Sequence, residues 1–300
     1  MGASFSGLIT PIEPGRSTHP ASIATAAAPT SHAVYANAAR RLEAAVASSC
    51  GSQHAVNEDA HSALDGSGRL FVVADGVGGG AMAQTASRLL VAHLHAALDA
   101  EPLDGARVAA AMLGADRAIA AAIARVTDRP GAATVALCAP IDAAASHWLV
   151  AWVGDCRVYR WSPRGTGLLE LLTRDDTFGH LGEAAPPGGS PSDPARMVGN
   201  GATSGANTAF HGLGRHGVLA LCSDGVHKHL DGADWSRALA APLPLTQRAR
   251  SLVALARSRG SVDDATVLLL HRGDPGARDA RWNPRGRERF GTGSNGGRAP

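Results

Sequence analysis

The chain has 300 residues, enough for one large domain or two small ones with a substantial buried core. Its 28 lysines and arginines against 26 aspartates and glutamates give a formal net charge of +2, which is too small to indicate binding to nucleic acid or to an anionic membrane. No apolar run approaches the roughly 20 residues that span a bilayer, and the N-terminus lacks the charged and then apolar pattern of an export signal. We therefore expect a soluble cytoplasmic protein that binds neither nucleic acid nor membranes.

The cysteine and lysine contents point to no special chemistry. Cys138, Cys156 and Cys222 lie in or beside apolar runs, Cys50 precedes a glycine, and no two of them form a CxxC pair. We expect reduced and mostly buried thiols in preference to disulfides or a zinc site. Lys228 is the single lysine, and we interpret the excess of arginine as a genome bias.

Both ends of the chain have the composition of flexible arms. Residues 1–30 are rich in Ser, Thr, Pro and Ala, and residues 274–300 are rich in Gly, Arg and Pro. Between them short apolar runs alternate with amphipathic stretches, and no repeat period emerges. We expect one compact domain of mixed helices and strands over residues 31–273.

The apolar spacing predicts both kinds of element within this domain. In chain order we expect a strand over 70–74, helices over 83–97 and 108–126, strands over 134–138, 147–153, 157–161 and 217–222, a helix over 249–256 and a strand over 265–270. Only residues 154–156 separate two of these strands, which predicts an antiparallel hairpin, because a parallel pair needs a crossover of about a dozen residues. Residues 177–211 are rich in proline and glycine, which predicts a long functional or mobile loop.

Two of the apolar strands end in the same way. One runs into Asp75-Gly76 and the other into Asp224-Gly225. An Asp-Gly pair after a strand is commonly just a turn, so each pair alone is a weak signal. Aspartate is nevertheless a poor strand residue and is costly to bury unpaired, and the repetition indicates a purpose.

Further acids accompany the remaining strands. Asp155 lies in the predicted hairpin, Asp263-Asp264 immediately precedes the last strand, and Glu58 and Asp59 precede the first. Carboxylate oxygens suit Mg²⁺ or Mn²⁺, and the chain has no HExxH motif or Cys/His cluster that would favour zinc. Two such ions about 3.5 to 4 Å apart can activate a bridging water and clamp a phosphoryl group. The ordered set therefore indicates hydrolysis of phosphoesters.

Two other kinds of site are disfavoured. Gly78, Gly79 and Gly80 form no nucleotide P-loop, because GxxxxGK[ST] is absent and the single lysine lies far along the sequence. The 13 histidines are scattered, and close pairs such as His227 and His229 are more often surface residues than metal ligands. We assign no histidine to metal.

Seven short motifs occur in a fixed order between residues 46 and 270. They are Asn57-Glu58-Asp59-Ala60, Val73-Ala74-Asp75-Gly76-Val77-Gly78-Gly79, Gly131-Ala132-Ala133-Thr134, Gly154-Asp155-Cys156-Arg157-Val158-Tyr159, Leu172-Thr173-Arg174-Asp175, Cys222-Ser223-Asp224-Gly225-Val226 and Asp263-Asp264-Ala265-Thr266. Each motif alone is weak, but the full set in register is specific. In this order the motifs resemble those of the PPM family, the type 2C metal-dependent protein serine/threonine phosphatases, and in particular its bacterial branch.

The resemblance implies an α+β fold, a four-layer α/β/β/α sandwich in which two central antiparallel β-sheets are flanked by antiparallel helices. Two Mn²⁺ or Mg²⁺ ions, with a weaker third ion as in bacterial members, would lie in a cleft at one edge. The loop over residues 177–211 would be the flap beside this cleft. Thr134, Arg157 and Thr266 would be structural supports.

The resemblance also assigns the metal ligands. Carried over position by position, Asp75 would bridge the two metals and the carbonyl oxygen of Gly76 would bind one of them. Asp224 and Asp263 would complete the direct ligands, so Asp75, Asp224 and Asp263 are the expected catalytic acids.

Three further acids would act around these ligands. Glu58 and Asp59 would lie near the metals and act largely through waters. Asp155, together with Asp224, would hold the weaker third ion.

The chain departs from the family pattern at several positions. His54 stands where the family usually has the arginine that grips the substrate phosphate, so His54 is the candidate for that role. Asp264 replaces the usual asparagine, as in some bacterial relatives, and adds charge near the site. Cys156 replaces a serine and Asp176 a histidine, and neither is a direct ligand. Val77 stands where animal members carry a histidine proposed as a general acid, so the leaving serine must take its proton from water.

The resemblance implies an active, monomeric phosphatase that acts on phosphorylated serine and threonine in proteins and opposes a bacterial serine/threonine kinase. The alternative is a non-catalytic module of the same fold that binds a phosphoprotein or a kinase without cleaving it, and His54 is the feature that favours it. A third candidate, an anti-sigma-antagonist phosphatase, is less favoured because the sequence shows no fused sensor domain.

Overall fold

The computed structural model describes residues 28–79, 81–99, 103–129, 131–163, 167–201, 203 and 205–275. The predicted arms over 1–30 and 274–300 therefore lie almost entirely outside the described residues. No helix within the described ranges combines the length and the apolar character needed to cross a membrane. All four cysteines are free and three of them are buried, as the sequence predicts.

Two antiparallel β-sheets form the centre of the molecule. The first sheet contains, in spatial order, β1 (Thr30–Ala36), β2 (Arg41–Ser49), β11 (Ala265–Gly273), β10 (Val218–Cys222), β7 (Arg157–Ser162) and β8 (Leu168–Leu171). The second sheet contains β3 (Ala60–His61), β4 (Phe71–Val77), β5 (Ala132–Pro140), β6 (His147–Val153) and β9 (Asn207–Gly212). All neighbouring strands pair antiparallel.

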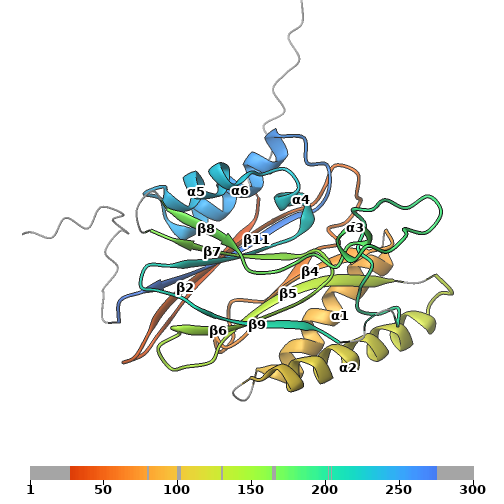
Figure 1. The fold of residues 1–300 in the computed structure, drawn as a ribbon, viewed down its shortest axis with the longest axis horizontal. Coiled ribbons are helices and arrows are strands. Elements are labelled where there is room, and N and C mark those ends of the chain that lie inside the picture. Colours follow the sequence, from red (N-terminus) through yellow and green to blue (C-terminus); the bar gives the residue numbers. More distant parts are fainter. Residues whose placement is uncertain are drawn as a thin grey trace, which may run out of the picture.

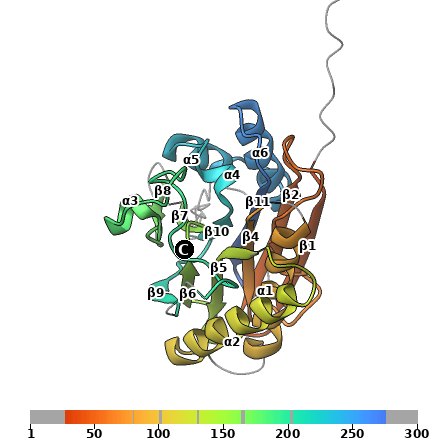
Figure 2. The same ribbon diagram turned by 90° about the vertical axis from the view of Figure 1, so that its right-hand side faces the viewer.

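Helices cover the outer face of each sheet. Helices α1 (Ala81–Leu98) and α2 (Gly105–Ala124) pack on the second sheet, and α5 (Gly232–Ala240) and α6 (Leu245–Ser258) pack on the first, on opposite sides of the molecule (Figure 1, Figure 2). A short helix, α4 (Asp224–His227), follows β10. Three hydrophobic clusters fill the spaces between the layers. The four-layer α+β sandwich implied by the resemblance is confirmed.

The middle cluster joins the two sheets. Leu42, Val46 and Leu268 from the first sheet and Phe71 and Val150 from the second are almost completely buried in it. Burial of such side chains contributes roughly 1.5–3 kcal/mol each. The strands that carry the acids are therefore fixed by apolar packing and not by the acids themselves.

The apolar spacing in the sequence predicts neither β1 nor β2. In β2, Leu42, Ala44 and Val46 face the middle cluster, whereas Ala45 and Ala47 face the cluster under α6. This alternation is the period of two that a strand buried on both faces requires. Alanine is a poor strand former and a good helix former, so an alanine-rich strand carries little signal in its composition.

The antiparallel hairpin predicted around residues 154–156 is wrong, because the chain passes there from one sheet to the other. β6 pairs with β5 and β9, whereas β7 pairs with β8 and β10. A short connection excludes a parallel crossover within one sheet, but it also permits a corner between two packed sheets. Gly154 has a φ of 93°, which side chains disfavour, and a Cβ there would overlap the side chain of Thr134. The β6–β7 corner places Asp155 between the sheets.

The predicted loop over residues 177–211 is only partly irregular. It begins with a single helical turn, α3 (Phe178–Leu181), and its last residues belong to β9 at the edge of the second sheet. Thr177 caps α3, since its side chain accepts a hydrogen bond from the amide of His180. β9 alternates exposed and half-buried residues, which is typical of an edge strand. Because several of these residues are polar, the sequence gives only a weak strand signal there.

α4 lies very close to the segment that precedes β11. At Gly225 a Cβ atom would overlap the carbonyl oxygen of Asp264 and lie 3.3 Å from the Cβ of Asp263. Ser261 Oγ donates to the carbonyl oxygen of Gly225 at 2.7 Å. Glycine therefore lets the backbones that carry Asp224 and Asp263 approach each other.

This close approach predicts that Gly225→Ala lowers the Tm by about 5 to 10 °C, because the added methyl group has no space without a backbone shift. Gly232→Ala is the matched control, since a Cβ there meets no atom within 4 Å and alanine is the better helix former. Its Tm should equal that of the wild type or exceed it slightly. Thermal unfolding followed by circular dichroism measures both. Equal Tm values for Gly225→Ala and the wild type would contradict the close approach.

Candidate metal centre

Acids from separate segments of both sheets meet at one place. Asp75 lies in β4, Asp224 begins α4, Asp155 lies at the β6–β7 corner, and Asp59 and Asp263 shortly precede β3 and β11. The Asp75 side chain keeps some solvent contact, yet the dense surroundings desolvate it and raise its pKa well above the usual range, and the charges of the other four acids raise it further. These predicted ligands are therefore neighbours in space.

Two of these acids are deeply buried. Burial raises the pKa of Asp59 to about 8, with the charges of Asp264 and Asp224 adding to the effect. Burial and the charge of Asp224 raise the pKa of Asp155 to about 7. A carboxyl group in such surroundings keeps its proton near neutral pH unless a cation is present. The cluster has more negative charge than the described side chains around it balance.

Three carboxylate oxygens of the cluster are shielded from solvent and accept no hydrogen bond from the described residues, namely Oδ1 of Asp59, Oδ1 of Asp224 and Oδ2 of Asp155. Lys228 Nζ lies 3.5 Å from the last of these, whereas the first two have no described cation beside them. The other oxygen of Asp59 and of Asp224 is occupied, because Ser223 Oγ donates to Asp59 Oδ2 at 2.7 Å and Lys228 Nζ donates to Asp224 Oδ2 at 2.6 Å. Buried acceptors are nearly always satisfied. The Oδ1 atoms of Asp59 and Asp224 therefore fit hard divalent cations such as Mn²⁺ or Mg²⁺.

The backbone around Gly76 is held from two sides. Its N–H donates to the carbonyl oxygen of Glu58 at 3.2 Å, and Ser87 Oγ donates to the same oxygen at 2.5 Å. A Cβ at Gly76 would overlap the carbonyl group of Ala83 in α1. β4, α1 and the segment before β3 are thus locked together, which holds Glu58 and Gly76 beside Asp75.

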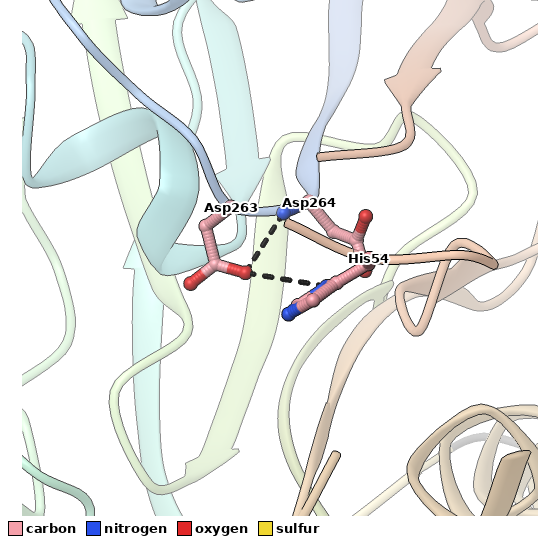
Figure 3. Close-up of side chains that lie close together, drawn as sticks. All are labelled: His54, Asp263 and Asp264. Carbon is pink, nitrogen blue, oxygen red and sulfur yellow. Dashed lines mark hydrogen bonds and ion pairs between the residues drawn. The ribbon is translucent and has the colours of Figure 1, made fainter. Parts of the chain in front are cut away.

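Asp264 organises the segment before β3, a task that the sequence does not reveal. Its Oδ1 accepts a hydrogen bond from the N–H of Gly51 at 2.6 Å, and its Oδ2 accepts one from the N–H of Glu58 at 2.7 Å. Nδ1 of His54 lies 2.9 Å from the same Oδ2 (Figure 3). Donors from one segment thus surround a buried carboxylate. Asp264 fixes this segment, and with it Glu58, against the start of β11.

His54 lies against both acids of the last motif. Its Nδ1 is 2.9 Å from Asp264 Oδ2 and 3.7 Å from Asp263 Oδ1, and its other ring nitrogen points away from Asp264 (Figure 3). The ligand atoms of these three residues lie within 4.8 Å of one another, but Asp264 already uses both oxygens for hydrogen bonds. The hydrogen bond with Asp264 raises the pKa of His54 above its usual value against partial burial. The charged form of the ring is therefore favoured beside Asp263.

Lys228 is a second cation at the acids. It follows α4, and its Nζ lies 2.6 Å from Asp224 Oδ2 and 3.5 Å from Asp155 Oδ2. Burial acts to raise the pKa of Asp224, but the charge and the hydrogen bond of Lys228, with smaller contributions from His227 and Asp75, together lower it. The acid pair that the resemblance assigns to a weaker third ion already has an ammonium group beside it.

His227 is buried, whereas its sequence context favours a surface position. Its Nε2 donates to the carbonyl oxygen of Asp155 at 2.9 Å, and burial lowers its pKa to about 4. The ring is therefore neutral at neutral pH and ties α4 to the β6–β7 corner. The sequence contains no signal for this contact, because it depends on the packing of two distant segments.

Arg157 and Thr266, two of the three expected structural supports, make contacts between separate strands and segments. Arg157 donates to both oxygens of Asp175, at 2.9 and 2.7 Å, and the hydroxyl groups of Thr266 and Ser48 lie 2.7 Å apart. These contacts join β7 to the segment after β8 and join β11 to β2.

Comparisons with known proteins identify the fold. No protein-family model and no curated protein sequence matches the chain. The catalytic domain of the serine/threonine protein phosphatase PstP, in complex with two manganese ions, matches with a TM-score of 0.65 and 27% identity over 78% of this chain and 99% of that domain. The PPM Ser-Thr phosphatase MsPP from Mycobacterium smegmatis, in complex with cacodylate, matches with a TM-score of 0.62 and 27% identity over 78% of this chain and 98% of MsPP. PppA from Pseudomonas aeruginosa matches with a TM-score of 0.64 and 27% identity over 77% of this chain and 97% of PppA.

The chain has the fold of the bacterial PPM-type serine/threonine phosphatases. The match covers nearly all of each solved domain, so the PPM-type fold accounts for the core of the chain. The segments that carry the PPM-type motifs in the sequence include those that meet at the acid cluster, namely β4, α4, the β6–β7 corner and the start of β11.

The raised pKa values predict that the metal-free protein loses stability as pH rises. In the unfolded chain Asp59 loses its proton near its ordinary pKa of 3.8, whereas in the folded chain it keeps the proton up to a pKa of about 8. Between these values the native state binds more protons than the unfolded state, so the free energy of unfolding falls with increasing pH. Saturating Mn²⁺ should reverse the trend, because metal binding requires deprotonated carboxylates.

Thermal unfolding between pH 5 and pH 8.5, with EDTA or with Mn²⁺, measures this effect. Asp59→Asn should flatten the metal-free pH dependence by about 5 °C over this range. Asp274→Asn is the control, since Asp274 pairs with Arg215 on the surface and its loss should leave the slope unchanged. A metal-free Tm that rises with pH would contradict the assignment of unbalanced acids.

Proposed function

We propose that this chain is a metal-dependent protein phosphatase that hydrolyses phosphoserine and phosphothreonine in proteins. The observation that carries the proposal is the cluster of buried acids with unpartnered oxygens. It lies in a PPM-type fold, and the PstP catalytic domain of that fold was crystallised with two manganese ions. The proposed cofactors are two Mn²⁺ or Mg²⁺ ions.

The residues that would hold the ions are the ones that the motifs assign. Asp75 and the carbonyl oxygen of Gly76, with Asp224 and Asp263, form the proposed direct ligands. When bound, such ions lower the pKa of a water to form the nucleophile and neutralise the charge of the phosphoryl group. Asp59 offers its unpartnered Oδ1 at the edge of this set.

The surrounding residues would position these ligands and the substrate. Ser223 orients the Asp59 carboxylate, and Asp264 holds the segment that carries Glu58. His54 would donate from the ring nitrogen that points away from Asp264 to an oxygen of the substrate phosphate. Val77 offers no proton, so the leaving serine or threonine would take its proton from solvent.

A groove beside the metal centre suits the peptide around the phosphorylated residue. It has a volume of about 390 Å³ and lies between the flap and α4, where its lining includes Thr177, His180, Pro191, His227 and Lys228. We place the flap over residues 177–211 at the substrate within a catalytic domain of residues 31–273. Flexible arms over 1–30 and 274–300 are part of the same proposal.

The proposed partners are phosphorylated proteins and the serine/threonine kinase that phosphorylates them. A net charge of +2 gives no reason to add nucleic acid or a membrane surface to the list. We propose a cytoplasmic monomer. The non-catalytic module is less favoured, because the chain keeps every proposed direct ligand and leaves three buried oxygens of the acid cluster without a hydrogen bond from the described residues.

Removal of one ligand charge should abolish turnover. Asp75→Asn and Asp224→Asn are each expected to reduce phosphate release from p-nitrophenyl phosphate with Mn²⁺ by about 100-fold or more. The metal-free Tm of Asp75→Asn should not fall, because the change relieves repulsion among the acids. Asp274→Asn should retain full activity.

The same assay tests the metal and the substrate. EDTA should stop the wild type, Mn²⁺ should restore it better than Ca²⁺, and a phosphothreonine peptide should be dephosphorylated. Full activity of Asp75→Asn, or equal support by Ca²⁺, would refute the two-metal site. Binding of the peptide without turnover would favour the non-catalytic module.

The contact between His54 and Asp264 predicts a coupled effect on substrate binding. An arginine at position 54 binds phosphate through two parallel hydrogen bonds, but Asp264 would capture it in the same way. The double variant His54→Arg/Asp264→Asn should therefore lower the KM for p-nitrophenyl phosphate by about tenfold, and His54→Arg alone by much less. A double-mutant cycle of KM values measures the coupling. Additive effects of the two changes would show that Asp264 does not control position 54.

A further inference from the structure

Lys228 contacts two acids of the metal centre without being one of its predicted ligands. Its Nζ lies 2.6 Å from Oδ2 of Asp224 and 3.5 Å from Oδ2 of Asp155. The side chains of Asp224 and Asp155 are 17% and 3% exposed, whereas that of Lys228 is 40% exposed. The aliphatic part of the lysine side chain is therefore partly exposed to solvent, and its ammonium group lies beside the two carboxylates.

The two oxygens of Asp224 have different partners. Oδ2 accepts a hydrogen bond from Lys228, whereas Oδ1 is buried and accepts none from the described residues. Oδ1 is thus available to the proposed metal centre and Oδ2 is not. Oδ2 of Asp155 is also buried and accepts no hydrogen bond from the described residues, and the ammonium group of Lys228 lies 3.5 Å from it, within ion-pair distance.

The surrounding elements hold Lys228 in this place. It follows Asp224 by four residues at the end of α4, the spacing that brings two side chains together on a helix. His227, the preceding residue, donates from Nε2 to the carbonyl oxygen of Asp155 at 2.9 Å. This buried hydrogen bond ties the end of α4 to the corner that carries Asp155, so the backbone of Lys228 is held within reach of both acids.

The residue type also fits the position. Lys228 is the single lysine among the 28 lysines and arginines of the chain, so every other strongly basic position is an arginine. An ammonium group is a compact point charge with three donors, whereas a guanidinium group is a planar fork that matches one carboxylate with two parallel hydrogen bonds. The compact group suits a place between carboxylates from two different segments.

We propose that Lys228 is the resident cation of the Asp155–Asp224 pair and that it excludes a third divalent ion from this pair. The ammonium group occupies the space and the Asp224 oxygen that such an ion would need, and it repels a divalent charge. The residues present therefore do not fit the weaker third ion that the resemblance implies. The inference rests on the proposed metal centre, but it concerns the number of ions and not the activity.

Counting bound Mn²⁺ by electron paramagnetic resonance of the free ion tests this directly. The wild type is expected to bind two Mn²⁺ per chain, and Lys228→Gln is expected to bind one more with a Kd in the millimolar range. The double variant Lys228→Gln/Asp155→Asn should lose the additional ion. Lys228→Met repeats the test with an uncharged side chain of similar length, and the Tm of each variant shows that it is folded.

Arg237→Gln is the matched control for the loss of one positive charge. Arg237 has a side chain that is 75% exposed and pairs with the buried Asp234, three residues earlier on α5, which Arg259 also contacts at 2.6 Å. This variant should keep the wild-type count. Equal counts in the wild type and both Lys228 variants would overturn the inference, as would three ions in the wild type. Fewer than two ions in the wild type, with one more in Lys228→Gln, would contradict the proposed two-metal function and support the role of Lys228.

Discussion

Crowding of carboxylates in a desolvated place is the constraint on which the rest of this structure depends. Burial and like charges raise the pKa values of Asp59, Asp75 and Asp155, so these groups oppose folding in their charged form. The acids therefore cannot hold the sheets together. The three hydrophobic clusters do so, and the fold keeps the acids in place against their repulsion. Such an arrangement is stable in its charged form only with added positive charge, which is the physical reason to expect metal ions.

The acids differ in how far the chain itself balances them. Asp264 is surrounded by N–H donors, and Asp224 has Lys228 on one oxygen. The pKa of Asp224 is lowered, although burial acts on it as it does on Asp59, whose pKa is raised. The ammonium group of Lys228 is the largest of the contributions that lower the pKa of Asp224, and Asp59 has no such cation beside it among the described residues. The charge that remains unbalanced gathers on Asp75 and Asp59, at the centre of the proposed site.

The sequence predicts the parts of the site that depend on local order. An aspartate followed by glycine after an apolar strand is visible in one segment, so Asp75 and Asp224 could be found without a structure. Contacts between segments could not. The short β6–β7 connection reads as a hairpin but is a corner between sheets, and only this corner brings Asp155 near Lys228. β2 was hidden for a related reason, since its strand character comes from burial on both faces and not from its alanines.

His54 and Asp264 are the two departures from the family pattern that lie nearest the proposed ligands, and their side chains interact directly. His54 and Asp264 are 210 residues apart in the chain, and in the sequence one removes a positive charge and the other adds a negative one. In the structure Asp264 raises the pKa of His54, which favours the charged form of the ring at the position where the family usually has an arginine. An arginine beside Asp264 would turn its planar fork toward that carboxylate. The imidazole uses one nitrogen for Asp264 and directs the other away from Asp264 (Figure 3), so the pair keeps a ring nitrogen that can face the substrate. His54 is therefore weaker support for a non-catalytic module than its sequence position alone suggests.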